Sequence, residues 1–209
     1  MTPYYQADGI TIYHGDCREI LRHVTGDVMV SDPPYGMAYQ SGWNASSNVA
    51  NDETPAARDW ALELWGGKPA LIFGRWSVPR PASSRELLIW DKGDWPGMGD
   101  LSLPWGPSTE EIYVLGSGFV GKRRGQIVRD PKRPKAGGHH PTEKPIGLME
   151  ILIAACPPGV IVDPFMGSGT TLVAAKNLGR RALGIELEEK YCEIAVKRLA
   201  QQTLFGAQP

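Results

Sequence analysis

Two short segments of this 209-residue chain contain residues suited to group transfer onto a nitrogen atom. The first is Asp32-Pro33-Pro34-Tyr35, in which a carboxylate and the Pro33 carbonyl could each accept one hydrogen of an amine. Two such bonds would localise a lone pair that is otherwise delocalised into a heterocycle. The locked φ angles of the prolines would fix the acceptors, and Tyr35 offers a flat face to a base. The segment therefore predicts a site that activates an exocyclic amine.

The second segment is rich in glycine and suits a nucleoside-type cofactor. Val160–Asp163 is typical of a buried strand, and Gly167-Ser168-Gly169 of a tight turn into a helix, where the backbone can approach a ligand closely. Leu172 stands where a dinucleotide fingerprint has its third glycine, which disfavours NAD. Glu186 ends the next predicted strand, about where an acidic residue would bind ribose hydroxyls.

The elements that must position these segments alternate between strands and helices. Helical patterns cover Cys17–Val24 and Thr170–Leu178, and an apolar stripe from Tyr191 to Leu199 predicts a last helix. This alternation predicts a mostly parallel sheet covered on both faces. The predicted strands are Thr11–Tyr13, Val28–Ser31, Ala70–Phe73, Leu87–Trp90, Ile112–Leu115, Val160–Val162 and Ala182–Ile185.

Composition favours one globular domain over residues 1–209. The chain is 42% hydrophobic with a net charge of -1, so any affinity for nucleic acid must come from a local patch. The longest apolar stretch, Ile151–Val162, is short and contains two prolines, so we expect no membrane span; the N-terminus also lacks the pattern of a secretion signal. Three cysteines and four histidines lack metal-ligand spacing, so we expect no metal, no disulfide framework and a cytoplasmic location.

Taken together and in this order, the two segments resemble the amino-methylating DNA methyltransferases of the permuted (beta) class, in which the catalytic block precedes the cofactor block. The resemblance implies the class I, Rossmann-like α/β fold, with a mostly parallel seven-stranded sheet and helices on both faces. It also implies S-adenosyl-L-methionine as cofactor and double-stranded DNA as substrate, with the target base flipped out of the duplex. In this family an Asp at position 32 goes mostly with adenine and a Ser mostly with cytosine.

The resemblance also assigns roles to individual residues. Asp32, Pro33, Pro34 and Tyr35 would form the catalytic block. Glu186 would hold the cofactor ribose, Asp16 its adenine amine, and Lys144 and the Asp163–Gly169 turn its methionine half. The implied cofactor set is Asp16, Cys17, Lys144, Asp163, Phe165, Gly167, Ser168, Gly169, Thr170 and Glu186. Methylation of the cytosine amine by the same geometry, and a non-catalytic binding protein of this fold, remain alternatives.

A short basic loop region, residues 116–141, is the candidate DNA-recognition segment, although a solvated surface loop would have the same composition. It offers phosphate contacts through Lys122, Arg123, Arg124, Arg129, Lys132, Arg133 and Lys135. Trp43, in the polar stretch after Tyr35, is a further candidate for holding the flipped base. Because little room is left for a large recognition region, we expect a short target site or help from a second subunit in a homodimer. A compact enzyme of this kind suits a bacterium or a phage.

Overall fold

The computed structural model describes residues 1–34, 56–93, 99–130 and 144–205, the last four of these as backbone only. The described residues form one nine-stranded sheet with the order β1-β2-β9-β8-β3-β4-β6-β5-β7. Its strands are β1 (Tyr5–Ala7), β2 (Ile10–His14), β3 (Val28–Ser31), β4 (Ala70–Gly74), β5 (Ser84–Asp91), β6 (Thr109–Leu115), β7 (Ile127–Val128), β8 (Ile161–Asp163) and β9 (Ala182–Glu186).

Five central strands, β2, β9, β8, β3 and β4, are parallel to one another. The antiparallel pairings lie toward the two ends of the sheet: β1 pairs with β2, and β6 runs between β4 and β5 in the opposite direction to both. The short strand β7 adds to β5 in parallel. The carboxyl ends of β2, β9, β8, β3 and β4 therefore meet at one edge, which we call the catalytic edge, and the start of β6 reaches that same edge.

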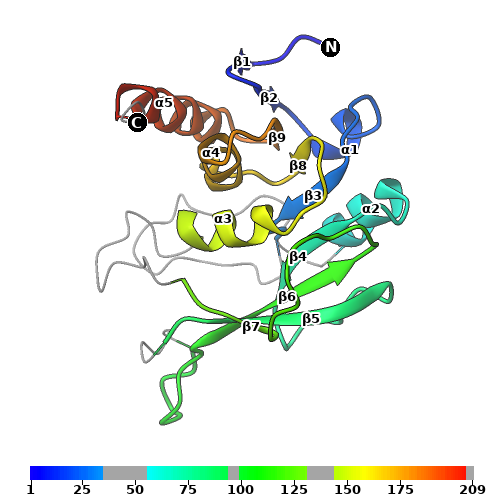
Figure 1. The fold of residues 1–209 in the computed structure, drawn as a ribbon, viewed down its shortest axis with the longest axis vertical. Coiled ribbons are helices and arrows are strands. Elements are labelled where there is room, and N and C mark those ends of the chain that lie inside the picture. The colour runs from blue at the N-terminus through cyan, green and yellow to red at the C-terminus, as the bar shows by residue number, and fades with distance from the viewer. Residues whose placement is uncertain (35–55, 94–98, 131–143, 206–209) are drawn as a thin grey trace.

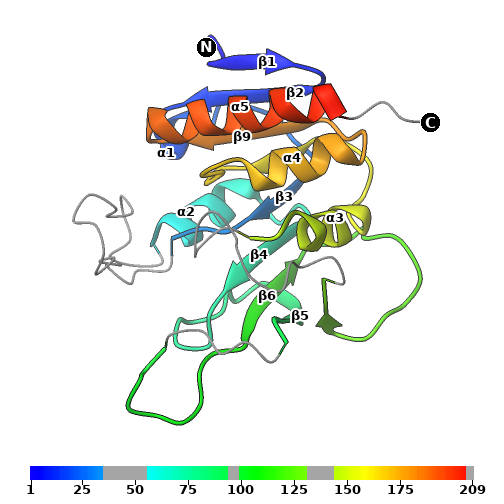
Figure 2. The ribbon, with the colours of Figure 1, turned by 90° about the vertical axis from the view of Figure 1, so that its left-hand side faces the viewer.

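The five helices of the described residues cover the two faces of the sheet (Figures 1 and 2). On one face lie α3 (Ile146–Ala154), α4 (Thr170–Asn177) and α5 (Glu189–Phe205), and on the other lie α1 (Cys17–Ile20) and α2 (Ala56–Trp65). No helix of the described residues is long and apolar enough to cross a membrane.

The apolar runs of the central strands supply both of the cores beneath these helices. Along β3, Val28 and Val30 pack with α3, α4 and α5, whereas Met29 between them packs with α1 and α2. Successive side chains of a strand point to opposite faces, so a strand buried on both faces is apolar at nearly every position. This is why β3 and β4 show continuous apolar runs instead of alternation.

The fold class and all seven predicted strands are confirmed. The sheet of the described residues has nine strands because β1 and β7 are added as its two outermost strands. Both are three residues or shorter, and β7 lies inside the stretch that we expected to be a loop. The helix expected over Cys17–Val24 ends at Ile20 and continues only as a turn, in which the His23 N–H bonds to the Ile20 carbonyl. Helices α2 and α3 were not predicted.

Candidate active site

The predicted catalytic block begins where β3 ends, at the catalytic edge. Asp32 directly follows the buried Ser31; Pro33 is buried, and Asp32 and Pro34 are half-buried. Tyr35 and Trp43 lie outside the described residues. In open α/β sheets this edge is where ligands bind.

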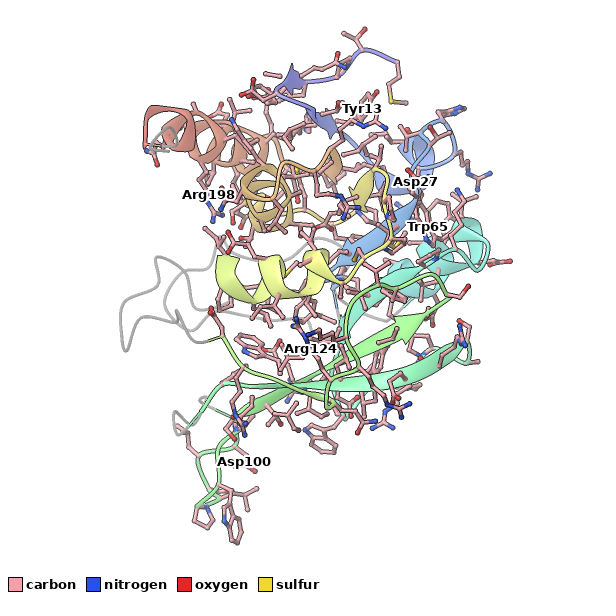
Figure 3. The ribbon with its side chains drawn as sticks, in the orientation of Figure 1. Tyr13, Asp27, Trp65, Asp100, Arg124 and Arg198 are labelled. Atoms are coloured by element: carbon pink, nitrogen blue, oxygen red, sulfur yellow. The ribbon has the colours of Figure 1, made fainter. Side chains whose placement is uncertain are left out.

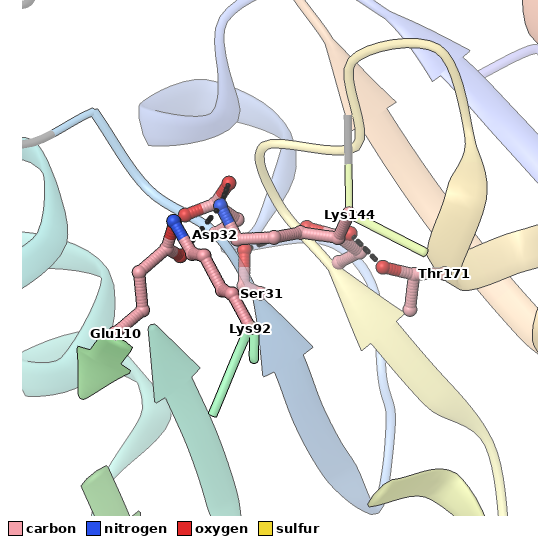
Figure 4. Close-up of polar contacts among 7 residues, drawn as sticks. Ser31, Asp32, Lys92, Glu110, Lys144 and Thr171 are labelled. Atoms are coloured by element: carbon pink, nitrogen blue, oxygen red, sulfur yellow. Dashed lines mark hydrogen bonds and ion pairs between the residues drawn. The ribbon is translucent and has the colours of Figure 1, made fainter. Parts of the chain in front are cut away.

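Asp32 takes part in a cluster of four charged side chains, which Figure 4 shows in close-up. The Lys144 ammonium lies 2.5 Å from Asp32 Oδ2 and 3.2 Å from Glu110 Oε2. Glu110 Oε1 in turn accepts a short bond from Lys92. We call Asp32, Lys144, Glu110 and Lys92 the charge cluster. It joins β3, the start of α3, β6 and the end of β5.

At two members of the charge cluster, Lys144 and Glu110, the effect of opposite charges on the pKa outweighs the effect of burial. Burial by itself would lower the pKa of Lys144, but the carboxylates of Asp32 and Glu110 leave that pKa above its usual value. Burial would likewise raise the pKa of Glu110, yet the ammonium groups of Lys144 and Lys92 bring it below its usual value. Two cations and two anions thus balance one another where the Asp32 carboxylate is held.

Asp163, at the end of β8, links the predicted catalytic and cofactor segments. Ser31 Oγ donates to its Oδ1 over 2.6 Å, and Thr171 Oγ1 donates to its Oδ2 over 2.5 Å. The Phe165 N–H also donates to Oδ1, over 3.1 Å. Asp163 is 3% exposed, and burial raises its pKa to about 6 in spite of these three donors. The carboxylate therefore fixes the end of β3 against the turn that follows β8.

The turn after β8 has the backbone geometry that its glycines predict. Gly167 has a φ of 50°, and Gly169, the N-cap of α4, has a φ of 82°. A side chain at Gly169 would also place its Cβ 2.7 Å from the Cβ of Ala195 on α5. Arg198 of α5 donates to the Ser168 carbonyl at 2.9 Å and to Ser168 Oγ at 2.8 Å (Figure 3). Helix α5 therefore holds the turn from outside.

Glu186 ends β9 beside this turn, as the sequence predicts. Its Oε2 accepts from the Gly167 N–H at 3.0 Å, and its Oε1 accepts from the Glu188 N–H at 2.8 Å. Burial raises the pKa of Glu186. Each carboxylate oxygen has a second lone pair, so both can also accept hydroxyl hydrogens of a ribose.

Asp16 lies one strand further along the catalytic edge. The pairing of His14 with Glu186 brings the ends of β2 and β9 together, and Asp16 follows as the N-cap of α1. Its carboxylate accepts from the N–H and the guanidinium of Arg18, and these bonds lower its pKa. Cys17 is buried in the core, and burial raises the pKa of its thiol to about 11.

These residues fit a nucleoside-type cofactor. The Gly167–Gly169 turn and Glu186 lie together at the end of β8 and β9. Gly184, in β9 behind the turn, has no space for a side chain, because its Cβ would come within 2.4 Å of Met166 Sδ. Lys144, also in the predicted cofactor set, binds Asp32 and Glu110 through its ammonium. Its contact with the cofactor stays a prediction.

Strand β7 separates the basic residues of the candidate DNA-recognition segment into those that precede it in the chain and those that follow it. Lys122, Arg123 and Arg124 precede it and are exposed. The pKa of Glu86, near the start of β5, is lowered by the Leu87 N–H, then by Gln126, and also by the charge of Arg123. Because β5 runs toward the catalytic edge, these three basic residues lie toward the opposite edge.

Arg129 follows β7 and lies at the catalytic edge. Its Nε is 2.8 Å from Asp91 Oδ2, at the end of β5, and its side chain is 72% exposed. Lys132, Arg133 and Lys135 lie outside the described residues. No group of three or more His, Cys, Asp or Glu side chains suited to a metal ion occurs among the residues that the structure describes.

Sequence reasoning missed Glu110 and Lys92. The available signal was the pair Glu110-Glu111 at the start of an otherwise apolar strand, because buried acids need a cation nearby. Glu111, on the other face, shows the same rule: it pairs with Arg80 at 2.6 Å and accepts from the Tyr113 hydroxyl at 2.7 Å.

Comparison with known proteins identifies the family of this chain. A family model described as DNA methylase matches residues 75–197, more than half of the chain. The chain belongs to the DNA methylase family. A type II methyltransferase of Lactococcus lactis subsp. cremoris, M2.LlaDCHI, is 47% identical, and the match covers 98% of this chain and 94% of that protein. This relative spans the Asp32 block, which lies outside the family model's match.

Solved structures agree with this DNA methylase fold. The crystal structure of the M1.HpyAVI–SAM complex has a TM-score of 0.66 at 25% identity, over 91% of this chain and 98% of that one. The cytosine-N4-specific PvuII DNA methyltransferase has a TM-score of 0.70 at 14% identity, over 98% and 96% of the two chains, and so shares the fold.

Proposed function

We propose that this DNA methylase transfers a methyl group from S-adenosyl-L-methionine to the exocyclic N6 amine of adenine in double-stranded DNA. The observation that carries the proposal is the placement of Asp32 beside the cofactor turn. Strands β3 and β8 are parallel neighbours, and the bond between Ser31 and Asp163 ties their ends together. An amine held by Asp32 would therefore lie next to a methyl group held by the turn.

The chain's residues would act mainly by binding and orienting the amine. The bound cofactor supplies an electrophilic methyl group on a sulfonium. The Asp32 carboxylate and the Pro33 carbonyl would each accept one amine hydrogen, which localises the nitrogen lone pair toward the methyl group. Tyr35 would stack on the flipped base. Positioning and electrostatics then favour in-line transfer, and no strong base is required because the product loses its extra proton readily.

For the cofactor, we propose that Glu186 accepts the ribose hydroxyls and that the turn lies against the methionine half. The positions of both at the ends of β8 and β9 support this assignment. Asp16, at the end of β2 on the far side of β9, is proposed to accept from the adenine amine. Cys17, the next residue, is buried, and it is proposed only to support this contact from the core.

On the DNA side, Arg129 is the described basic residue whose position best supports phosphate contact, since it lies at the catalytic edge. The basic residues before β7 would reach only DNA that extends around the sheet toward its opposite edge. The homodimer stays a proposal. The three cysteines are free and buried, which supports a reducing, cytoplasmic location.

The decisive experiment is methyl transfer from labelled S-adenosylmethionine to unmethylated duplex DNA, followed by nucleoside analysis. Labelled N6-methyladenine would support the proposal. Labelled N4-methylcytosine would agree with the same mechanism but would show that the target base is cytosine. Asp32→Ala should abolish transfer with the affinity for S-adenosylmethionine retained. Full activity in that variant would refute the catalytic role of Asp32. If the wild type bound the cofactor but transferred no methyl group to DNA, the proposal that DNA is the substrate would be refuted.

A further inference from the structure

The ammonium of Lys144 lies on the catalytic carboxylate, which differs from the cofactor contact that its sequence motif implies. Its Nζ is 2.5 Å from Asp32 Oδ2, and this pair links the start of α3 to the end of β3 (Figure 4). We propose that Lys144 is a positioning residue for the Asp32 carboxylate and that Glu110 of β6 holds Lys144 in place. This inference rests on the proposed function only in naming Asp32 as the group that receives the amine.

The Lys144 ammonium is confined on several sides. Its side chain is 11% exposed, and Glu110 Oε2 lies 3.2 Å from Nζ. The ring of Phe73, near the end of β4, lies 5.0 Å from the same nitrogen. A lysine has three N–H donors, so Lys144 can bond to both carboxylates at once. Its position fixes the rotation of the Asp32 carboxylate, which would decide where an amine hydrogen finds its acceptor.

Glu110 is itself anchored by a second lysine. Lys92, the residue that follows β5, donates to Glu110 Oε1, and its ammonium lies 5.0 Å from the ring of Trp90. The Glu110 side chain is 24% exposed, compared with 29% for Asp32. A partly buried acid with a cation on each oxygen has little freedom to reorient, so Glu110 suits the task of holding Lys144 over Asp32.

The charges of the cluster also suit the reaction. The amine nitrogen becomes positive as it receives the methyl group, so a lone ammonium beside Asp32 would oppose the transfer. Glu110 offsets the charge of Lys144, and the Asp32 carboxylate remains as the charge nearest the substrate. Lys144 can therefore orient Asp32 without making the site positive. Removal of the Glu110 charge would leave two lysines against one acid.

The test separates positioning from cofactor binding by measuring each alone. Affinity for S-adenosylmethionine is measured at equilibrium without DNA, and the methyl-transfer rate is measured in a single turnover with cofactor and DNA saturating. For Lys144→Met we expect the dissociation constant to stay within about twofold and the rate to fall about 100-fold, as for a misplaced catalytic group. Lys144→Arg, which keeps the positive charge, should recover part of the rate. Glu110→Gln should lower the rate with the affinity unchanged.

Lys176→Met is the matched control. Lys176 has a side-chain exposure of 16% and an ion pair to Asp8 of 2.8 Å, but it lies at the far end of α4 from the turn. It should change neither the affinity nor the saturated rate. A loss of S-adenosylmethionine affinity of about tenfold or more in Lys144→Met would overturn the proposal, since that is the signature of a cofactor ligand. An unchanged saturated rate would overturn it equally.

A thermal-unfolding measurement keeps the inference testable independently of the substrate. We expect Lys144→Met to lower the Tm of the wild type by more than it lowers the Tm of Asp32→Ala, because the two side chains share one interaction. Equal Tm shifts in the two backgrounds would contradict the pairing. If wild type transferred no methyl to DNA, the proposed function would fail, while the cofactor-affinity and Tm results would still decide the role of Lys144.

Discussion

The raised pKa of the buried Asp163 carboxylate predicts a contribution to stability that falls as the pH rises through the weakly acidic range. Its pKa is raised from 3.8 to about 6 in the folded protein, chiefly by burial. Between these two values the folded state retains a proton that the unfolded state has lost. Its stabilising contribution is thus complete below pH 3.8 and is lost as the pH rises to about 6. A difference of about two pKa units corresponds to about 3 kcal/mol.

The substitution Asp163→Asn isolates this effect, because an amide of the same shape does not titrate. Its oxygen can still accept from Ser31 and from the Phe165 N–H, and its NH2 group can donate to the Thr171 hydroxyl. We expect the free energy of unfolding of the variant, relative to wild type, to increase by up to about 3 kcal/mol from pH 4 to pH 8.

The assay for Asp163→Asn is urea unfolding of both proteins at each pH, with m-values compared so that two-state behaviour is checked. The difference between the two proteins cancels the titration of every other carboxylate. A difference that stays constant from pH 4 to pH 8 would refute the raised pKa. A difference that changes in the opposite direction would mean that the Ser31 and Thr171 hydroxyls outweigh burial.

Three further changes test the cofactor turn and the DNA contacts. Glu186→Gln should weaken S-adenosylmethionine binding about tenfold or more in a calorimetric titration, because one carboxylate oxygen becomes a donor facing an N–H; unchanged affinity would contradict the assigned role. Gly169→Ala should lower the free energy of unfolding by about 1–3 kcal/mol, from a left-handed φ and a clash with α5. The control Gly125→Ala, where a Cβ meets nothing within 4 Å, should show no such clash penalty in the same unfolding assay. Arg129→Gln should reduce the slope of the logarithm of DNA affinity against the logarithm of salt concentration by about 1. Arg123→Gln should leave this slope unchanged if DNA binds only at the catalytic edge.

The central part of the fold could be predicted because burial on both faces of the sheet requires short, continuous apolar runs, which are visible in the sequence. Val28–Val30 and Ala70–Phe73 are continuous apolar runs that only a doubly covered strand requires. The edge strands β1 and β7 have no such requirement, since an edge strand packs against fewer neighbours. Ile127–Val128 is only two residues long and resembles a loop until β5 is placed beside it.

The cofactor turn could be predicted because local backbone geometry demands particular residues. Only glycine adopts the φ angles of Gly167 and Gly169 at low cost, and only an acid at the end of β9 can accept both N–H groups that face it. The contacts of Lys144 could not be predicted in the same way. An ion pair depends on which side chains are brought together from distant parts of the chain, here 112 residues apart.

The direction of β6 decides which acid lies near the Asp32–Lys144 pair. Alternating strands and helices predict parallel strands, and a parallel β6 would begin at the opposite edge, about 20 Å away for a strand of this length. In the structure β6 runs antiparallel to β4, with Glu111 paired to Gly74 at the end of β4. Glu110, one residue earlier, therefore lies near the start of β6, at the level where β3 ends. A reversal of one strand thus supplies the anion that balances Lys144, and the charge cluster follows from the topology of the sheet as much as from the motifs.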